Sequence, residues 1–220
     1  MIETDYIMRM IGLLATFLSR LFFLKRAKEF PQALAEIDRT AKSLLGVDRN
    51  MIRRFSPAQF MEFFGSDQTL ALPKRYVLGV LLKEEASILY QERKLDESAV
   101  SALKSLDLLM DTLLKSGNTL DPAHEKHLIE AVDLLGKSDL AAESQERLFA
   151  CYELLGRFDR AENLLFELLL HDARFLESGR LFYERLLAKS DDDLIRGKLP
   201  RLEVEEGVRE LQRRFGCAKR

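Results

Sequence analysis

The chain has 220 residues, of which 47% are hydrophobic and 32% are charged, with 11 Gly, 5 Pro and no Trp. This composition is typical of a helical globular protein with one large or two small domains, and it excludes a disordered chain. Runs of alternating apolar and polar residues bounded by turn residues are scarce, so we expect no sheet.

The net charge of −2 conceals an uneven distribution. It is +4 in residues 1–56, −10 in residues 57–195 and +4 in residues 196–220. A long acidic segment is a poor surface for nucleic acid, whose phosphates need clustered Lys and Arg, so we expect no nucleic-acid partner. The basic ends could meet an acidic partner, and the alternative is that all these charges only solvate helix faces.

The two cysteines, Cys151 and Cys217, are too few and too far apart for a disulfide framework, and no CxxC or CxxH spacing occurs. The reducing cytosol is therefore the expected compartment, and the protein is expected to be cytoplasmic. Cys151 lies on an apolar helical face, which predicts a packing residue and not a nucleophile.

Residues 5–26 are the most hydrophobic segment, and apolar side chains cover most of the circumference of the predicted helix. We expect such a helix to be buried. Glu3 and Asp5 stand where a signal peptide carries positive charge. Arg9 and Arg20 leave about ten uninterrupted apolar positions, roughly half of what a bilayer needs. Packing within the fold or across a homodimer is therefore favoured over contact with a membrane surface.

A shorter helix follows at residues 28–45, with Pro31 in its first turn and Gly46 after its last. A second, short helix begins with the capping box of Ser56 and Gln59. Four aromatic side chains cluster around it, and they are Phe55, Phe60, Phe63 and Phe64. Their helical spacing indicates core packing, with a ligand pocket as the alternative.

A helix over residues 121–136 begins with Asp121 as its cap and carries His124 and His127 one turn apart. Two imidazoles at this spacing could bind a metal with Asp121 and Glu130. The segment has no third His or Cys and no HExxH motif. We therefore expect an exposed polar helix face and no metal.

Residues 142–170 contain two apolar runs with helical spacing, separated by Gly156. The first run consists of Leu148, Cys151, Tyr152 and Leu155, and the second consists of Ala161, Leu164, Leu165, Leu168 and Leu169. Gly156 can adopt the left-handed conformation that ends a helix. The link of Arg157 and Phe158 is so short that the two helices must pack antiparallel.

This hairpin resembles a tetratricopeptide repeat. The residues that match the pattern of that family are Leu148, Tyr152, Gly156, Phe158, Ala161 and Leu165. The turn requires Gly, and the helix crossing requires a residue as small as Ala161. Three positions depart from the family: Ser144 replaces its Trp, Phe149 its small residue after the Leu, and Ala173 its closing Pro.

Two further segments carry weaker copies of this pattern. The first copy consists of Phe30, Ala33 and Ile37. The second consists of Tyr90, Ala99 and Leu103, on one long helix from Pro73 to about Lys94 and another over residues 96–115, with Lys94 in place of the turn Gly. The small residues Ala33, Ala99 and Ala161 are 66 and 62 positions apart. Because this is about twice the tetratricopeptide period, we expect extra helices between the copies.

Beyond residue 173 the pattern weakens, and predicted helices at residues 181–187 and 202–215 close the chain, as atypical end repeats do. Ser190 is expected to begin a helix whose first turn is acidic. The acidic residues are Asp191, Asp192 and Asp193, and they lack the spacing of a calcium loop.

The opening DYIMRMI and the later YELLGRFDRAENLLFELL are similar to an uncharacterised family of bacterial proteins, classed only as a domain of unknown function. This resemblance covers most of the chain. It implies no activity and no site residues.

The sequence thus predicts an all-α protein. By the tetratricopeptide resemblance, antiparallel helical hairpins stack as a right-handed superhelix with irregular extra helices. Residues 1–46 hold the long hydrophobic helix and first hairpin, and residues 47–72 hold short connecting helices. Residues 73–220 form the tetratricopeptide-like region with a C-terminal capping helix. We expect these regions to form one continuous domain.

No GxxxxGK[ST], GxGxxG or GxSxG motif is present, so we expect neither an enzyme nor a cofactor. The tetratricopeptide resemblance implies a scaffold that binds a peptide or helix of another protein in a groove. Six carboxylates occupy expected groove positions, and they are Glu84, Glu85, Glu92, Glu143, Glu146 and Glu153. An acidic groove predicts a basic peptide, and the alternative is that these residues only keep helix faces soluble.

Two other functions remain open. The N-terminal helix could join two copies of the chain as a self-associating structural protein. It could instead act as the anchor of a peripheral membrane adaptor.

Overall fold

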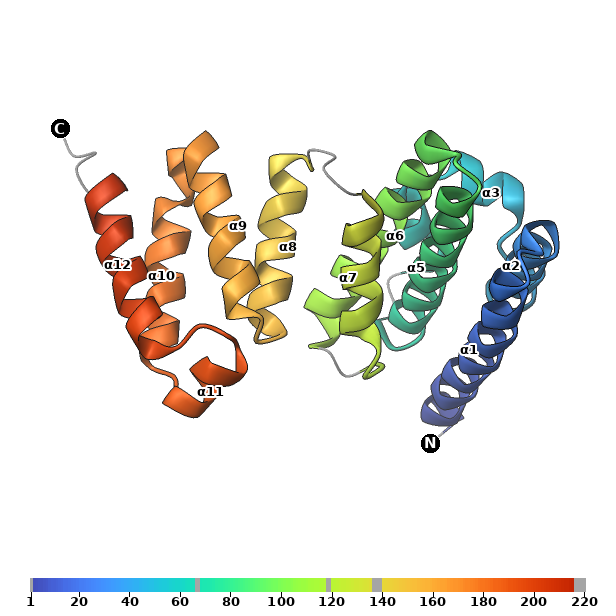
Figure 1. Ribbon diagram of the computed structural model, residues 1–220. Helices are drawn as coiled ribbons and strands as arrows, with labels where there is room; N and C mark the ends of the chain where they lie inside the picture. Colours follow the sequence, from blue (N-terminus) through green and yellow to red (C-terminus); the bar gives the residue numbers. More distant parts are fainter. Residues whose placement is uncertain (1, 66–67, 118–119, 136–139, 216–220) are drawn as a thin grey trace. The chain divides into compact units, whose positions relative to one another are not determined.

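The structure is a computed structural model that describes residues 2–65, 68–117, 120–135 and 140–215 (Figure 1). Within these residues there are twelve α-helices, one short 3-10 helix and no strand, so the all-α class is confirmed. Cys217 and the end of the basic tail lie outside the described residues.

The chain divides into two compact units, residues 1–138 and residues 139–220. Unit 1 contains α1 (Ile2–Arg26), α2 (Phe30–Leu45), α3 (Arg49–Arg54), α4 (Pro57–Phe63), α5 (Gln68–Gln91), α6 (Leu95–Ser116) and α7 (His124–Leu135). Unit 2 contains α8 (Ala142–Leu154), α9 (Phe158–His171), the 3-10 helix (Ala173–Phe175), α10 (Leu176–Leu187), α11 (Asp191–Arg196) and α12 (Arg201–Phe215). The predicted boundaries near residues 46 and 72 fall inside unit 1, and the predicted repeat region is divided between the units.

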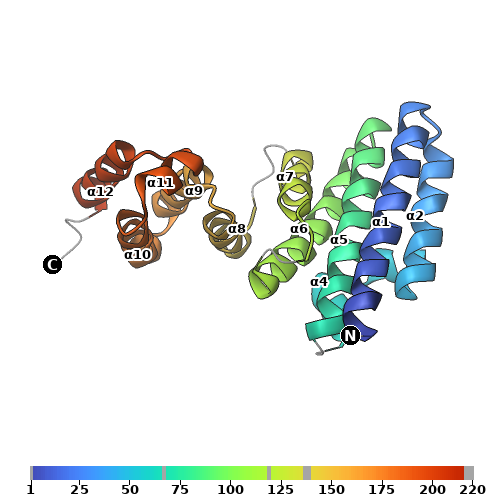
Figure 2. The same cartoon turned by 90° about the horizontal axis from the view of Figure 1, so that it is seen from below.

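Helix α5 is the centre of unit 1 and packs against α1, α2, α4, α6 and α7 (Figure 2). Every residue from 76 to 84 is buried. Helix α6 approaches closely at Gly79, where an added Cβ would lie 3.0 Å from Leu109 Cγ. The Ser105 hydroxyl donates a hydrogen bond of 2.7 Å to the Gly79 carbonyl. This close approach accounts for a glycine in the middle of a long helix.

The predicted start of α5 at Pro73 is wrong, because the helix begins at Gln68 and Pro73 lies inside it. A proline lacks the amide hydrogen that an interior helical position normally donates. Ala71 and Leu72, on the N-terminal side of Pro73, are buried. Their burial offsets the missing hydrogen bond and keeps this turn helical.

Three helix pairs share one turn, which also ends α11 at Lys198 (φ 57°). Their links contain a residue in the left-handed conformation: Lys28 (φ 59°) before α2, Arg93 (φ 65°) before α6 and Gly156 (φ 68°) before α9. In each pair the next amide donates a hydrogen bond back to the last turn of the preceding helix. These bonds are Glu29 N–H to Leu24 O (3.0 Å), Lys94 N–H to Leu89 O (3.0 Å) and Arg157 N–H to Tyr152 O (2.8 Å). This six-to-one bond defines a Schellman motif, so the three pairs end their first helix in the same way.

The shared turn places a small residue five positions later at each helix crossing. Ala33, Ser98 and Ala161 are all fully or almost fully buried. The predicted use of Ala99 is therefore wrong by one residue, because the left-handed residue is Arg93 and precedes Lys94.

The same shift corrects the rest of the α5–α6 copy. Tyr90 and Leu103 were expected to pack, but they are 51% and 41% exposed. Leu89 and Ala102 take the buried positions. In the α8–α9 pair the expected packing residues Leu148, Tyr152, Phe158, Ala161 and Leu165 are all buried.

Unit 2 adds α10, α11 and α12 to the α8–α9 hairpin. Phe149 of α8 and Phe182 of α10 pack edge to face, with ring centroids 5.3 Å apart. The Tyr183 hydroxyl donates a hydrogen bond of 2.6 Å to Glu162 Oε1 of α9. An added Cβ on Gly207 of α12 would lie 2.2 Å from this hydroxyl, so α12 can approach α10 only at a glycine.

Several local predictions hold. The capping box of Ser56 and Gln59 begins α4, and Ser190 caps α11 by accepting the Asp193 amide. The phenylalanine cluster around α4 is present, although Phe63 remains 47% exposed. Cys151 is buried, as expected of a packing residue. Burial raises the pKa of its thiol to about 12.

Arg93 provides a test of the shared turn. An L-residue in the left-handed conformation is less stable than glycine by about 1 kcal/mol. Arg93→Gly should therefore raise the free energy of unfolding by about 0.5–1 kcal/mol in urea denaturation. Gly156→Ala at the matching turn should lower it by a similar amount. Unchanged stability in both variants would contradict the shared turn.

Candidate functional site

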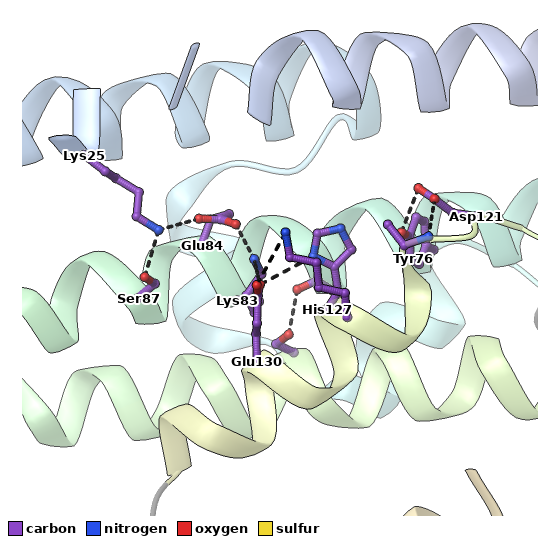
Figure 3. Close-up of polar contacts among 12 residues, drawn as sticks. Lys25, Tyr76, Lys83, Glu84, Ser87, Asp121, His127 and Glu130 are labelled. Atoms are coloured by element: carbon purple, nitrogen blue, oxygen red, sulfur yellow. Dashed lines mark hydrogen bonds and ion pairs between the residues drawn. The ribbon is translucent and has the colours of Figure 1, made fainter. Parts of the chain in front are cut away.

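A cluster of charged side chains lies inside unit 1, where α1 and α7 flank α5 (Figure 3). Its centre is the pair Lys83 and Glu84 on α5, whose exposed fractions are 3% and 8%. Burying a charge is unfavourable by several kcal/mol unless the charge is paired and hydrogen-bonded. The partners of these two side chains therefore determine whether unit 1 can form.

Those partners come from the two flanking helices. The Lys83 ammonium donates hydrogen bonds to Glu84 and, at 2.7 Å, to Glu130 Oε2 of α7. The Lys25 ammonium of α1 donates to Glu84 Oε2 and to Ser87 Oγ, both at 2.8 Å. Lysines and glutamates thus alternate along a chain of contacts that connects α1, α5 and α7.

Glu84 remains ionised within this cluster. Burial alone would raise the pKa of its carboxyl, but the adjacent Lys83 and Lys25 ammonium groups outweigh burial and lower that pKa below its ordinary value. The carboxylate therefore stays charged and holds both lysines in place.

His127 lies beside the pair and is only 5% exposed. Burial and the charge of Lys83 lower the pKa of its imidazole to about 4, so the ring is neutral at pH 7. Its Nδ1 atom is 3.9 Å from Glu130 Oε2 and has no hydrogen-bond partner among the described residues. A buried polar atom of this kind is available to a ligand.

These side chains line a cavity of about 580 Å³, which we call the α1–α5–α7 cavity. Its apolar lining consists of Leu18, Phe22, Tyr90 and Leu134. Its polar lining consists of Lys25, Lys83, Glu84, Ser87, Lys126, His127, Glu130 and Asp133. Phe22 and Tyr90 are 56% and 51% exposed, so aromatic groups stand at the rim above a floor of buried, paired charges.

The expected exposed face of the two histidines is wrong. His124 is fully buried, with its ring centroid 4.7 Å from that of Tyr76 and its Nε2 atom 2.9 Å from the Leu109 carbonyl. Tyr76 in turn donates a hydrogen bond of 2.9 Å to Asp121. His124 therefore fixes the start of α7 against α5 and α6, and His127 is placed one turn further on.

The three predicted groove carboxylates of unit 1, which are Glu84, Glu85 and Glu92, do not form one acidic surface. Glu84 lines the α1–α5–α7 cavity, whereas Glu85 lies near Arg49 and Ser101 in a second cavity of about 340 Å³. Adjacent positions on a helix point about 100° apart, which accounts for the separation. Glu92 is paired with Lys94.

In unit 2, Glu143 and Glu146 are exposed. Glu153 accepts two hydrogen bonds from Arg185. A role for the six carboxylates in binding stays a prediction.

The sequence reasoning missed Lys25, Lys83, His127 and Glu130 as members of a site. One signal was present in the segment YVLGVLLKEEASILY of α5. A Lys–Glu pair inside a helix that is apolar on every side indicates a buried ion pair, which needs partners from other helices.

No group of three or more His, Cys, Asp and Glu side chains among the described residues is arranged to hold a metal ion. One described helix, over residues 7–26, is long and apolar enough to cross a bilayer by length and composition. Core helices of soluble proteins can meet the same criteria, so these properties alone do not identify a membrane span.

Residues 1–216 match a family of unknown function, DUF6483. The chain belongs to that family. The expected similarity to an uncharacterised family is therefore confirmed. Neither the search of curated proteins nor the search of solved structures found a match.

The buried imidazole makes stability depend on pH. The pKa of His127 is about 4 in the folded protein and about 6.5 in the unfolded chain. Between these values the unfolded chain binds more protons, so the free energy of unfolding falls as pH falls, by at most about 1.4 kcal/mol per pH unit for this group. His127→Gln should flatten this dependence between pH 7 and pH 5 in chemical denaturation, whereas the exposed control His171→Gln should not. An unaltered slope in His127→Gln would show that the imidazole protonates freely in the folded protein.

Removing the buried ammonium tests the charge cluster. Lys83→Met should lower the free energy of unfolding by about 3 kcal/mol, because Glu84 and Glu130 lose a buried partner. The control Lys94→Met removes the more exposed pair with Glu92 and should cost about 0.5 kcal/mol or less. Equal urea midpoints for the two variants would mean that Lys83 is not buried in a paired state.

Proposed function

We propose that this protein is a non-catalytic helical scaffold that binds a segment of another protein in the α1–α5–α7 cavity. The observation that carries the proposal is the pairing of exposed rim aromatics, Phe22 and Tyr90, with a floor of buried charges held by Lys83 and Glu84. Binding sites commonly combine an apolar wall with a few fixed polar groups that orient the ligand.

The shared turn supports a tetratricopeptide-like architecture for this scaffold. The left-handed residues Lys28, Arg93 and Gly156 are 65 and 63 positions apart. These spacings are close to twice the 34-residue period of that repeat, and α3, α4 and α7 supply the extra helices. Stacking of the pairs into a right-handed superhelix stays a prediction.

The state of the polar groups favours binding over catalysis. A general base needs a free lone pair and a pKa near the working pH, whereas the pKa of His127 is about 4. Lys83 has its hydrogen bonds directed to two carboxylates. The Cys151 thiol, with a pKa near 12, is a poor nucleophile. The two cysteines and the acidic middle of the chain further favour a cytoplasmic protein without a nucleic-acid partner.

The charges of the lining revise the expected ligand. Lys25, Lys83 and Lys126 balance the three carboxylates of the lining, and Glu84 is already paired with two of these lysines. A strongly basic peptide would therefore meet a lining whose carboxylates are balanced by lysines, with Glu84 and Glu130 already paired. We propose instead a helix or extended segment that inserts an apolar side chain between Phe22 and Tyr90 and offers a polar group to His127.

A phage-displayed library of helix-length random peptides, selected on the wild-type protein, tests this site. Peptides that bind wild type should lose at least about tenfold in affinity for Tyr90→Glu, which corresponds to about 1.4 kcal/mol. Leu202→Glu, an equally simple surface change in unit 2, is the control, because Leu202 is 64% exposed and far along the chain. Selected peptides that bind Tyr90→Glu as tightly as wild type would rule the cavity out as the binding site.

A further inference from the structure

Helix α1 has two apolar sides, and unit 1 uses only one of them. Met10, Leu14, Phe17 and Leu21 are buried against the rest of unit 1, and α1 packs on α2 and α5. On the other side Met8, Phe22 and Phe23 are 68%, 56% and 66% exposed. Of the residues in the apolar stretch, 22% are buried. We expect this helix to be buried within the fold or across a homodimer, and unit 1 by itself buries only the inner face.

An exposed apolar face on one helix is a typical interaction surface. The large residues stand near its ends, whereas small residues occupy its middle, and these are Gly12, Ala15, Thr16 and Ser19. The Thr16 hydroxyl donates to the Gly12 carbonyl at 3.0 Å, so it can enter an apolar contact with its hydrogen bond already made. A membrane-surface helix would instead carry Trp, Phe or Leu on its apolar face in place of these small residues.

No close packing contact among the described residues explains a glycine at position 12. An added Cβ at this position would meet no atom within 4 Å. Glycine in a helix interior is unfavourable by about 1 kcal/mol relative to alanine. A second helix packed over the middle of this face would give the small residues a role, because small side chains let two helix backbones approach closely.

We infer that the outer face of α1 pairs with the same face of a second copy of this chain, in antiparallel orientation. With the two-fold axis between Ala15 and Thr16, Gly12 of one copy lies opposite Ser19 of the other, and Met8 lies opposite Phe23. Small residues then oppose small residues, and a thioether meets an aromatic ring. Such an isologous contact closes on itself as a dimer.

The helix dipoles favour the antiparallel orientation. In an antiparallel pair the dipoles of the two α1 helices oppose each other, whereas in a parallel pair they point the same way.

The second copy would bear on the candidate site, although this inference does not depend on the proposed function. Phe22 belongs to the outer face of α1 and also lines the α1–α5–α7 cavity. The partner helix would cover part of its ring and extend the wall of the cavity. Dimerisation and the cavity therefore share one aromatic side chain.

Light scattering after size exclusion tests the dimer. Wild type should show a mass twice the 25.3 kDa of one chain. Phe23→Glu, which changes the exposed face without touching the cavity lining, should weaken the dimer at least about tenfold while its circular dichroism and melting stay unchanged. Ile195→Glu is the matched control, because Ile195 of unit 2 is 63% exposed, and it should remain dimeric.

Cross-linking tests the orientation. Oxidised Gly12→Cys mixed with Ser19→Cys should give a disulfide-linked dimer, and neither variant alone should do so to the same extent, in a background where Cys217 is replaced by Ser. A monomeric wild type, a dimer that survives Phe23→Glu, or binding of the monomer to anionic lipid vesicles would overturn the inference. Preferential linking of Gly12→Cys to itself would overturn the antiparallel arrangement.

Discussion

The middle of α5 is enclosed by other helices, and this enclosure decides where the charges of unit 1 can lie. Every residue from 76 to 84 is buried, yet the segment ends in Lys83 and Glu84. Because an unpaired buried charge would be unfavourable by several kcal/mol, Lys25 of α1 and Glu130 of α7 complete the hydrogen bonds of this pair. Those two helices are consequently held on either side of α5 at a spacing that leaves a cavity between them. The candidate site therefore exists because the buried charges of α5 need hydrogen-bond partners from both neighbouring helices.

The sequence contained enough information for the helices, their caps and most hairpin partners. It was sufficient at Gly156, because glycine is the residue type that a left-handed turn favours. It was insufficient at Arg93, where the same turn is formed by a residue that rarely adopts this conformation. The hydrogen bond of Lys94 N–H to Leu89 O and the packing of α5 against α6 select the left-handed conformation of Arg93. The residue type alone does not indicate this conformation. Because the turn was placed one residue too late in the sequence, Tyr90 and Leu103 were expected in the core, although both lie on the surface.

The candidate site was harder to predict for a different reason. Lys83 is 47 positions from Glu130, and Glu84 is 59 positions from Lys25, so the ion pairs exist only once three helices are assembled. His124 has the polarity of a surface residue, and only the Leu109 carbonyl and the ring of Tyr76 make its burial favourable. For α1 the sequence shows apolar side chains around most of the helix, and unit 1 buries only one side of it. A pattern cannot say which side meets its own chain.

Pairing of α1 with a second copy, as we propose, would link association to the cavity. Leu18, Phe22 and Lys25 lie within two turns of this helix and line the cavity, and Lys25 is anchored to Glu84. A second copy that orders the outer face of α1 would also order this wall, so a ligand of the cavity would meet side chains whose motion is already restricted. Such coupling is reciprocal: a segment that binds between Phe22 and Tyr90 would stabilise the orientation of α1 that the second copy requires. Because the carboxylate of Glu84 ties that wall to the core, any change that loosens the charge cluster would weaken both contacts together.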